Sequence, residues 1–132
     1  MGTMRTIDNN KLIAEFLGYN PKTKREVGAI LNKDVYEWYQ RDVNIYYING
    51  DYHSEDYLLF HNNWNWLMEA VDKIESFEDE NRCAKYNVNI EQSFVEIIDK
   101  HTYYEIVETS RDTKIEATYE AVIQFINYYN KQ

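Results

Sequence analysis

Histidine and carboxylate side chains gather in one short stretch of the chain, and both are residue types that bind transition metals. Two imidazoles and three carboxylates fall within eleven residues: Asp51, His53, Glu55, Asp56 and His61. Zinc and similar ions use such ligands, but the ligand atoms must converge to about 2 Å from one point. The spacing of His53 and His61 follows no recognised ligand pattern. We therefore expect a solvated loop here, with no metal and no cofactor.

The sequence contains few of the residue patterns that nucleophilic or acid/base catalysis requires. The three histidines are scattered, no serine lies in a Gly-x-Ser-x-Gly turn, and four glycines leave little room for a phosphate-binding loop. Cys83 could pair with His101 across neighbouring strands, but a small structural cysteine is the more common case. The acidic run 78–80 follows a helix, where its charges oppose the helix dipole and favour solvation. We therefore expect no enzyme.

Aromatic residues are more numerous than a core of this size needs. The chain has 13 tyrosines and three tryptophans, so some of them are expected on the surface. Exposed tyrosine and tryptophan are enriched at binding hot spots. One hypothesis is an aromatic interface, and the other is that these rings cover the second face of a small sheet. The residues of the expected interface are Tyr36, Trp38, Tyr39, Tyr46, Tyr52, Tyr57 and Trp66.

The composition describes a folded, acidic chain. It has 132 residues with 14 Lys+Arg and 23 Asp+Glu, a formal charge of −9, and 44% hydrophobic residues. That apolar content argues against disorder. The negative charge disfavours direct nucleic-acid binding, which relies on lysine and arginine. The single cysteine forms no internal disulfide, and no apolar run approaches the about 20 residues that span a bilayer, so we expect no membrane insertion.

The negative charge is concentrated in the middle of the sequence. Residues 1–33 carry a net +3, residues 34–80 a net −10 and residues 81–132 a net −2. The acidic stretch overlaps the part of the chain richest in tyrosine and tryptophan. Because an acidic surface attracts basic partners over long range, we place the expected function in this stretch.

Three segments show the apolar spacing of amphipathic helices. The first begins at Asp8 or Asn9 and stops near Gly18, a residue type common just after a helix. The second runs from Asn62 or Asn63 to about Phe77, and Trp66 falls off its apolar stripe, which suggests exposure. The third begins with Thr113 and Glu116 at capping-box spacing.

Between these helices the apolar pattern changes to a period of two, which is typical of strands. The Asn49-Gly50 dipeptide predicts a tight hairpin turn. The class is therefore α+β, with three amphipathic helices and an antiparallel sheet built from two three-stranded segments in the order αβββαβββα. We expect one domain over residues 4–132, with residues 1–3 a cloning addition. The expected strands are 36–40, 43–48 and a segment after the turn, then 86–91, 94–98 and 103–108.

The helical segments resemble a group of small uncharacterised proteins encoded by bacteriophages and prophages, often in the Bacteroidota. The resemblance rests on residues 9–16, on the Trp64-Asn65-Trp66-Leu67-Met68 opening of the second helix, and on residues 113–130. The region from about Tyr19 to Asp56 has no counterpart. The resemblance implies a phage or mobile-element origin and a bacterial cytoplasm as the place of action. It implies no activity and no site residues.

Two non-enzymatic functions fit these observations. The first is a phage or prophage accessory protein that binds a host protein with a basic surface, in its sharpest form an acidic nucleic-acid mimic or anti-defence inhibitor. The second is a small-ligand or nucleotide-binding, sponge-like protein in which tyrosine and tryptophan stack on bases and Arg41, with Arg82 or Arg111, holds phosphates. The apolar stripe of the third helix also allows a homodimer.

Overall fold

The computed structural model describes residues 4–31 and 43–132. These residues form an α+β structure with four α-helices, a short 3-10 helix and two antiparallel sheets. Contacts divide the chain into two compact units, Met1–Leu58 and Leu59–Gln132, and each is described by itself below. The single domain over residues 4–132 stays a prediction. The expected strand 36–40 and the expected cloning addition lie outside the described residues.

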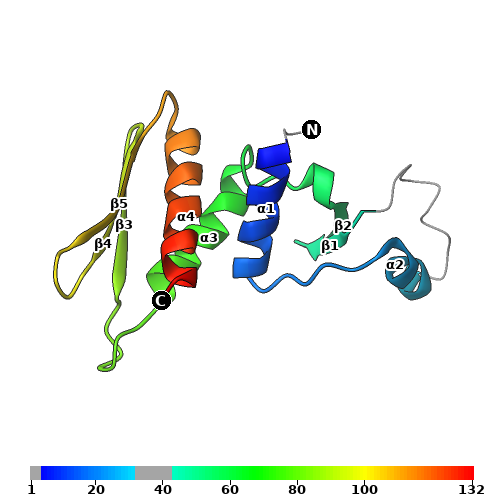
Figure 1. Cartoon of the computed structure of the whole chain (residues 1–132), viewed down its shortest axis with the longest axis horizontal. Helices are drawn as coiled ribbons and strands as arrows, with labels where there is room; N and C mark the ends of the chain where they lie inside the picture. Colours follow the sequence, from blue (N-terminus) through cyan, green and yellow to red (C-terminus); the bar gives the residue numbers. More distant parts are fainter. Residues whose placement is uncertain (1–3, 32–42) are drawn as a thin grey trace. The chain divides into compact units, whose positions relative to one another are not determined.

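The first unit is built from two helices and a hairpin. Helix α1 is Met4–Phe16 and helix α2 is Lys24–Leu31, and strands β1 (Ile45–Ile48) and β2 (Asp51–Ser54) pair antiparallel before the 3-10 helix η2 (Glu55–Tyr57) (Figure 1). Asn49 and Gly50 both have positive φ, 54° and 86°, as a type I′ turn requires. The predicted hairpin is therefore confirmed.

Two polar contacts fasten η2 and the residue after it to α1. Asn10 on α1 is buried and donates a hydrogen bond from Nδ2 to the carbonyl of Leu58, at 3.0 Å. The ammonium of the next residue, Lys11, lies 2.8 Å from the carboxylate of Glu55. Ile13 and Ala14 of α1 are fully buried. The predicted first helix is thus confirmed, although it begins at Met4 and not at Asp8 or Asn9.

Helix α2 was not predicted, so the expectation of three helices is wrong. Its eight residues give too short a window for a clear helical stripe. A local signal was nevertheless present, because Thr23 and Glu26 stand at capping-box spacing and the Thr23 hydroxyl accepts a hydrogen bond from the Glu26 backbone N–H. The first β segment has two strands within the described residues, plus an isolated bridge between Lys22 and Ile45.

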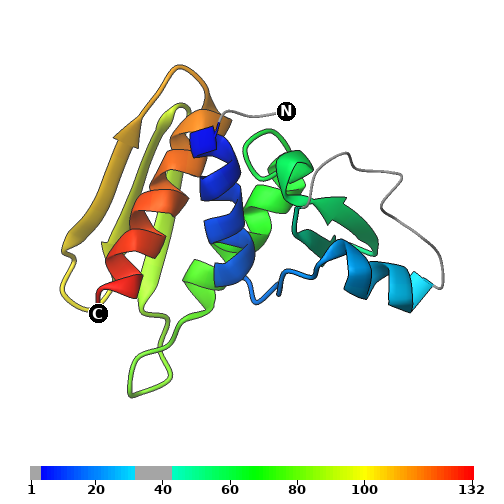
Figure 2. The same cartoon turned by 45° about the vertical axis from the view of Figure 1, so that its right-hand side comes forward.

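The second unit packs two helices on one face of a three-stranded sheet. Strands β3 (Tyr86–Glu91), β4 (Phe94–Asp99) and β5 (Glu105–Ser110) form an antiparallel meander in the order β3-β4-β5. Helix α3 (Trp64–Ser76) contacts β3, and helix α4 (Lys114–Asn130) lies along the sheet and contacts all three strands (Figure 2). The three strands, predicted as 86–91, 94–98 and 103–108, are confirmed with shifts of up to two residues at their ends.

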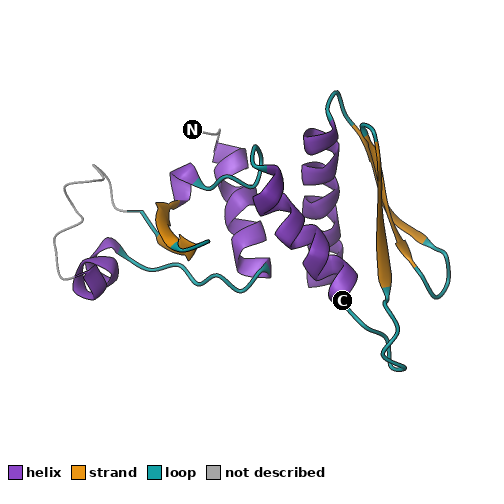
Figure 3. Cartoon of the chain, turned by 180° about the vertical axis from the view of Figure 1, so that it is seen from behind, coloured by secondary structure: helices purple, strands orange, loops and turns teal. Residues whose placement is uncertain are grey.

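Alternation along the strands separates a buried face from an open one. Val95, Ile97 and Val107 point toward the helices and are almost fully buried, and the register places Ile97 opposite both Val88 and Val107. Within this unit no other described element lies on the opposite side of the sheet (Figure 3). The residues between the buried ones therefore form an open surface.

The two helices of this unit begin at predicted caps. The Asn63 side chain accepts a hydrogen bond from the Trp66 backbone N–H at 3.1 Å. Thr113 accepts from the Glu116 backbone N–H at 3.2 Å, and its hydroxyl lies 2.7 Å from the Glu116 carboxylate. Each bond satisfies an N–H that has no partner inside the helix.

Candidate functional site

Two of the seven residues of the expected aromatic interface are buried in the structure. Tyr46 and Trp66 are buried, with 0% and 7% of their surface exposed, so their expected exposure is wrong. Tyr52 is half-buried, and Tyr57 is 56% exposed. Three of the expected residues, Tyr36, Trp38 and Tyr39, lie outside the described residues. The aromatic interface and its alternative, rings that cover the second face of a small sheet, both stay predictions.

Trp66 is buried because the contact face of α3 is rotated from the predicted stripe. The buried residues of this helix are Trp66, Leu67, Ala70, Val71 and Ile74, and Trp64 in the first turn is 37% exposed. The Trp66 ring packs edge-on against Phe60, with centroids 5.2 Å apart. The apolar pattern placed Trp64 on the stripe and Trp66 off it, and the packing of α3 reverses the two.

Tyr46 is buried because it lies on the covered face of β1, which it shares with Ile48. Ile45, Tyr46 and Ile48 are all buried and only Tyr47 is exposed. Burial raises the pKa of the Tyr46 hydroxyl to about 12, and the carboxylates of Glu15 and Glu55 add to this shift. The hydroxyl has no hydrogen-bond partner among the described residues.

The residues first considered for metal binding do not assemble. Glu55 is engaged by Lys11. His61 belongs to the second unit, where it lies beside the Tyr119 ring with centroids 6.3 Å apart and burial lowers its pKa. Over residues 4–31 and 43–132, no group of three or more His, Cys, Asp or Glu side chains could hold a metal ion.

Cys83 belongs to a loop that is organised by Asp79. The Asp79 carboxylate accepts hydrogen bonds from the backbone N–H groups of Asn81 and Cys83, and these bonds lower its pKa. The Cys83 thiol itself points to the carbonyl of Asn81, at 3.8 Å. His101 lines an open pocket of about 440 Å³ beside this loop, with walls formed by Glu78, Asp79, Glu80, Asn81, Lys85, Asp99 and His101. Four carboxylates in these walls disfavour a phosphate ligand.

The open side of the β3-β4-β5 sheet carries a group of carboxylates that the sequence analysis did not single out. We call this side the outer sheet face. At its centre Glu96 on β4 is directly opposite Glu108 on β5. Glu96 also accepts a hydrogen bond from the Asn89 side chain of β3, at 3.2 Å. The residues of the outer sheet face are Asn87, Asn89, Glu91, Phe94, Glu96, Ile98, Glu105, Ile106, Glu108 and Ser110.

A β-bulge brings a third carboxylate to this group. Ile97 pairs with Val107 whereas Ile98 pairs with Glu105, so β5 has one extra residue, Ile106, at this point. Glu105 reaches Glu108, and a hydrogen bond between the two carboxyl groups raises the pKa of Glu105 to about 7, with the charges of Glu108 and Glu96 adding to the shift. We call Glu96, Glu105 and Glu108 the acidic triad.

Comparisons with known proteins give no match: no protein-family model, no curated protein and no solved structure matches this chain. The resemblance to phage-encoded proteins therefore stays a prediction. A separate finding concerns membranes, since none of the described helices has both the length and the apolar character needed to cross a bilayer.

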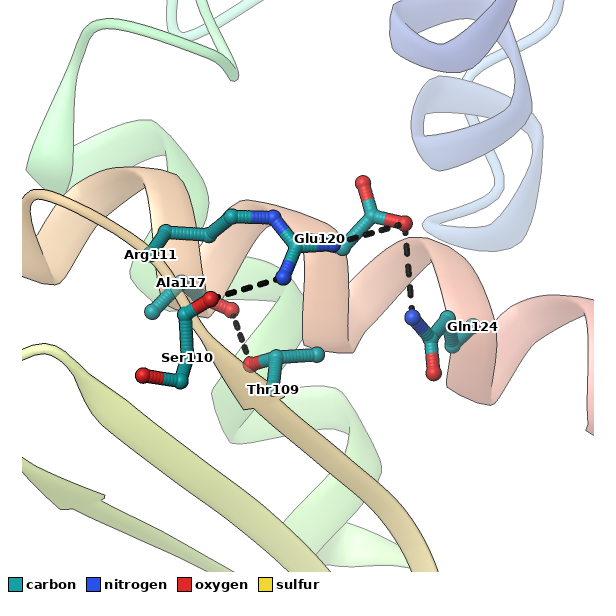
Figure 4. A network of polar contacts seen from close by, with 6 residues as sticks. All are labelled: Thr109, Ser110, Arg111, Ala117, Glu120 and Gln124. Atoms are coloured by element: carbon teal, nitrogen blue, oxygen red, sulfur yellow. Dashed lines mark hydrogen bonds and ion pairs between the residues drawn. The ribbon is translucent and has the colours of Figure 1, made fainter.

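The acidic triad has no cation of its own among the described residues. No lysine, arginine or histidine in that part of the chain forms an ion pair with Glu96, Glu105 or Glu108. Arg111 directly follows β5, but its guanidinium is held elsewhere: it donates to the Ser110 carbonyl at 2.7 Å and lies 3.7 Å from the Glu120 carboxylate on α4 (Figure 4).

The contacts of Arg111 also bear on the nucleotide hypothesis. Gln124 donates to the Glu120 carboxylate, and the buried Thr109 hydroxyl donates to the Ala117 carbonyl at 2.7 Å, so this network fastens α4 to β5 (Figure 4). Arg111 thus has a structural role. Arg82 lies in the exposed loop at residues 79–83, and Arg41 lies outside the described residues. No phosphate-binding group of arginines is seen among the described residues.

Most of the negative charge of the chain lies in the second unit, although the most acidic stretch of the sequence is its middle. The first unit, residues 1–58, has seven Lys+Arg and nine Asp+Glu, a net −2. The second unit, residues 59–132, has seven and fourteen, a net −7. The −10 stretch at residues 34–80 crosses the boundary between the units, so most of the imbalance belongs to the unit that carries the acidic triad.

Proposed function

We propose that this protein is a non-catalytic binding protein that engages a macromolecule with a basic surface through the outer sheet face. The observation that carries the proposal is the acidic triad: three carboxylates crowd together on an open sheet face and meet no cation among the described residues. Like charges directly opposite each other destabilise a sheet. A basic partner would remove this repulsion when it binds.

The electrostatics of the second unit support the same partner. Its net −7 produces a field that attracts a basic surface over long range and speeds encounter at low salt. The triad then offers carboxylate oxygens for short, charge-assisted hydrogen bonds. Double-stranded or single-stranded nucleic acid is repelled by the same field, and the direct partner in this proposal is a protein.

The biological setting in this proposal comes from the sequence resemblance. A phage or prophage accessory protein acting in the bacterial cytoplasm would use its carboxylates to imitate nucleic-acid phosphates and occupy a basic host surface, as an anti-defence inhibitor does. The second unit supports this form of the proposal only through its charge and its open sheet face.

A charge-matched pair of variants tests the proposal. The Glu96→Gln/Glu108→Gln variant and the Asp8→Asn/Asp72→Asn variant each lose two charges, but only the first alters the outer sheet face, since Asp8 and Asp72 are exposed on α1 and α3. Binding of a fluorescent oligoarginine peptide is measured by anisotropy at about 50 mM and about 500 mM salt. We expect the wild-type protein to bind more weakly at the higher salt.

The two variants should then differ. We expect the Glu96/Glu108 variant to lose about tenfold in affinity, which is the effect of removing about 1.4 kcal/mol of charge-assisted contact. The Asp8/Asp72 variant should bind within about twofold of wild type. Equal losses in the two variants would show that only net charge matters and would refute a site on this face.

A further inference from the structure

Strand β5 forms one edge of the three-stranded sheet. The order β3-β4-β5 gives it β4 as a neighbour on one side, and within residues 4–31 and 43–132 no further strand and no isolated bridge pairs with its other side (Figure 2). The main-chain N–H and C=O groups along the free side of an edge strand are a template for another strand. The sheet can therefore be extended at β5.

The register identifies the main-chain groups on this free edge. The Arg111 N–H donates to the Ser93 carbonyl at 3.2 Å, so these two residues form a hydrogen-bonded pair at the end of the β4-β5 ladder. Hydrogen-bonded and non-hydrogen-bonded pairs alternate along antiparallel strands. Counting from this pair, Thr109 directs its main-chain groups to β4, whereas Glu108 and Ser110 direct theirs away from β4. Because the Ser110 carbonyl accepts from the Arg111 guanidinium, the edge offers the N–H of Ser110 and both groups of Glu108.

The opposite edge of the sheet is covered by a helix. The Val88 N–H on β3 donates to the Glu75 carboxylate on α3, at 3.2 Å, and α3 packs along β3. A strand that added to β3 would have to displace this contact. We therefore expect a new strand to pair with β5 and not with β3.

The edge strand is held in place before any partner arrives. Val107 and Thr109 are almost fully buried, and the Thr109 hydroxyl donates to the Ala117 carbonyl of α4 at 2.7 Å. The strand therefore loses little conformational freedom when another strand pairs with it. Such preorganisation lowers the free-energy cost of binding.

The side chains beside the free edge select the occupant by charge. Glu108 is exposed, and a residue directly opposite it on an added strand would have its Cβ about 4.5–5.5 Å away, where an opposite charge stabilises the pair and a like charge destabilises it. β5 itself contains two glutamates and no lysine or arginine. A second copy of β5 would therefore crowd carboxylates together, whereas a basic strand would neutralise them.

We propose that the free edge of β5 accepts an extended, basic segment of a protein partner as an added antiparallel strand, with an arginine or lysine of that segment opposite Glu108. Main-chain hydrogen bonds to Glu108 and Ser110 supply affinity, and the carboxylates of the acidic triad supply selectivity. The inference rests on the proposed function and extends it, because it names the conformation of the partner segment and the edge that binds it. The free main-chain groups of β5 and its charge complementarity to a basic strand carry it.

Two N-methylated peptides test the strand addition directly. In an antiparallel pair, the partner residue opposite Glu108 has its side chain on the outer sheet face and its N–H directed to β5. A peptide that alternates arginine with threonine therefore turns its arginine N–H groups toward β5 and its threonine N–H groups toward solvent. N-methylation of the arginines blocks the pairing, whereas N-methylation of the threonines leaves it intact. The two methylated peptides have the same composition and the same charge.

Binding of the three peptides to the full chain is measured by anisotropy at about 50 mM salt. We expect the unmethylated and the threonine-methylated peptides to bind within about threefold of each other. The arginine-methylated peptide should bind at least about tenfold more weakly, which corresponds to about 1.4 kcal/mol for the lost main-chain hydrogen bonds.

Proline variants test the same edge from the side of the protein. Proline lacks an N–H and is tolerated in an edge strand where that N–H faces solvent. Glu108→Pro and Glu108→Gln lose the same charge, and we expect the proline variant to bind the unmethylated peptide about tenfold more weakly than the glutamine variant. Ser110→Pro and Ser110→Ala form a second pair that keeps every carboxylate, and the proline variant should again bind more weakly. Circular dichroism and thermal unfolding show whether each variant is folded.

The possible failures are distinguishable. If the two methylated peptides bind equally and Glu96→Gln/Glu108→Gln still weakens binding, the strand addition is refuted and the proposed function survives. If the protein alone dimerises in analytical ultracentrifugation and Glu108→Pro abolishes the dimer, the occupant of the edge is a second copy and the inference is overturned. If wild type binds no basic peptide at low salt, both the proposed function and this inference are refuted.

Discussion

Glu96 and Glu108 are directly opposite each other on neighbouring strands of the β3-β4-β5 sheet, and no cation from the described residues lies between them. Cross-strand pairs on one face of an antiparallel sheet have Cβ atoms about 4.5–5.5 Å apart, close enough for their charges to interact. The pair therefore costs stability in the isolated protein. Removing one of these charges should therefore stabilise the protein, whereas a change at a neutral surface position should not.

Replacing Glu108 by lysine should stabilise the protein and abolish binding to a basic partner. Glu108→Lys turns a like-charge pair into an opposite-charge pair, which we expect to raise the free energy of unfolding by about 0.5–1 kcal/mol. Thermal unfolding should shift upward by about 2–5 °C. Anisotropy with the arginine peptide should show a loss of more than about tenfold. A destabilised variant that still binds would contradict both the repulsion and the site.

The Glu105 carboxyl should make stability fall as the pH rises toward neutrality. Its pKa in the folded protein is about 7, above the ordinary value of 4.5, so the folded state binds more protons than the unfolded state between these pH values. This stabilising contribution is complete below about pH 4.5 and is lost as the pH rises through about 7.

Glu105→Gln isolates this contribution, because glutamine resembles the protonated carboxyl at every pH. Thermal unfolding of the variant and of wild type should coincide near pH 4.5, and the variant should become the more stable protein as the pH rises to 7 and above. A difference between the two proteins that does not change with pH would show that the crowding of the triad leaves Glu105 unaffected.

Removing the hydroxyl of Tyr46 should not destabilise the protein. This hydroxyl is buried without a hydrogen-bond partner among the described residues, and burial of an unsatisfied polar group costs about 1–3 kcal/mol. We expect Tyr46→Phe to match or exceed wild type by up to about 1 kcal/mol in chemical denaturation. Tyr47→Phe, on the exposed side of β1, is the matched control and should stay within about 0.5 kcal/mol. A clear loss in Tyr46→Phe alone would reveal a partner for the hydroxyl.

The Thr113 cap should contribute measurably to the second unit. Thr113→Ala leaves the Glu116 backbone N–H without its acceptor, and we expect a loss of about 1 kcal/mol in unfolding free energy. Thr113→Ser keeps the hydroxyl and should lose less than about 0.5 kcal/mol. If serine and alanine were equally destabilising, the contribution would come from the threonine methyl group and not from the cap.

The sequence by itself determined the features that depend on near neighbours. The Asn49-Gly50 turn, the start of α4 at Thr113 and the alternation that defines β3, β4 and β5 each follow from a few consecutive residues, because turn geometry, capping and strand periodicity are local. Thr23 and Glu26 carried a comparable local signal for α2, but that helix was too short to show a clear apolar stripe. The α+β class follows from these local elements.

Only the tertiary structure decided which side chains meet. Trp66 is buried and Trp64 is partly exposed because packing sets the contact face of α3, and Tyr46 is buried because it shares the covered face of β1 with Ile48. The acidic triad depends on the register between β4 and β5 and on the extra residue Ile106 in the bulge. Strand register and bulges join residues that are distant in sequence, so the charge pattern along the chain pointed to residues 34–80, whereas folding gathered the triad on β4 and β5.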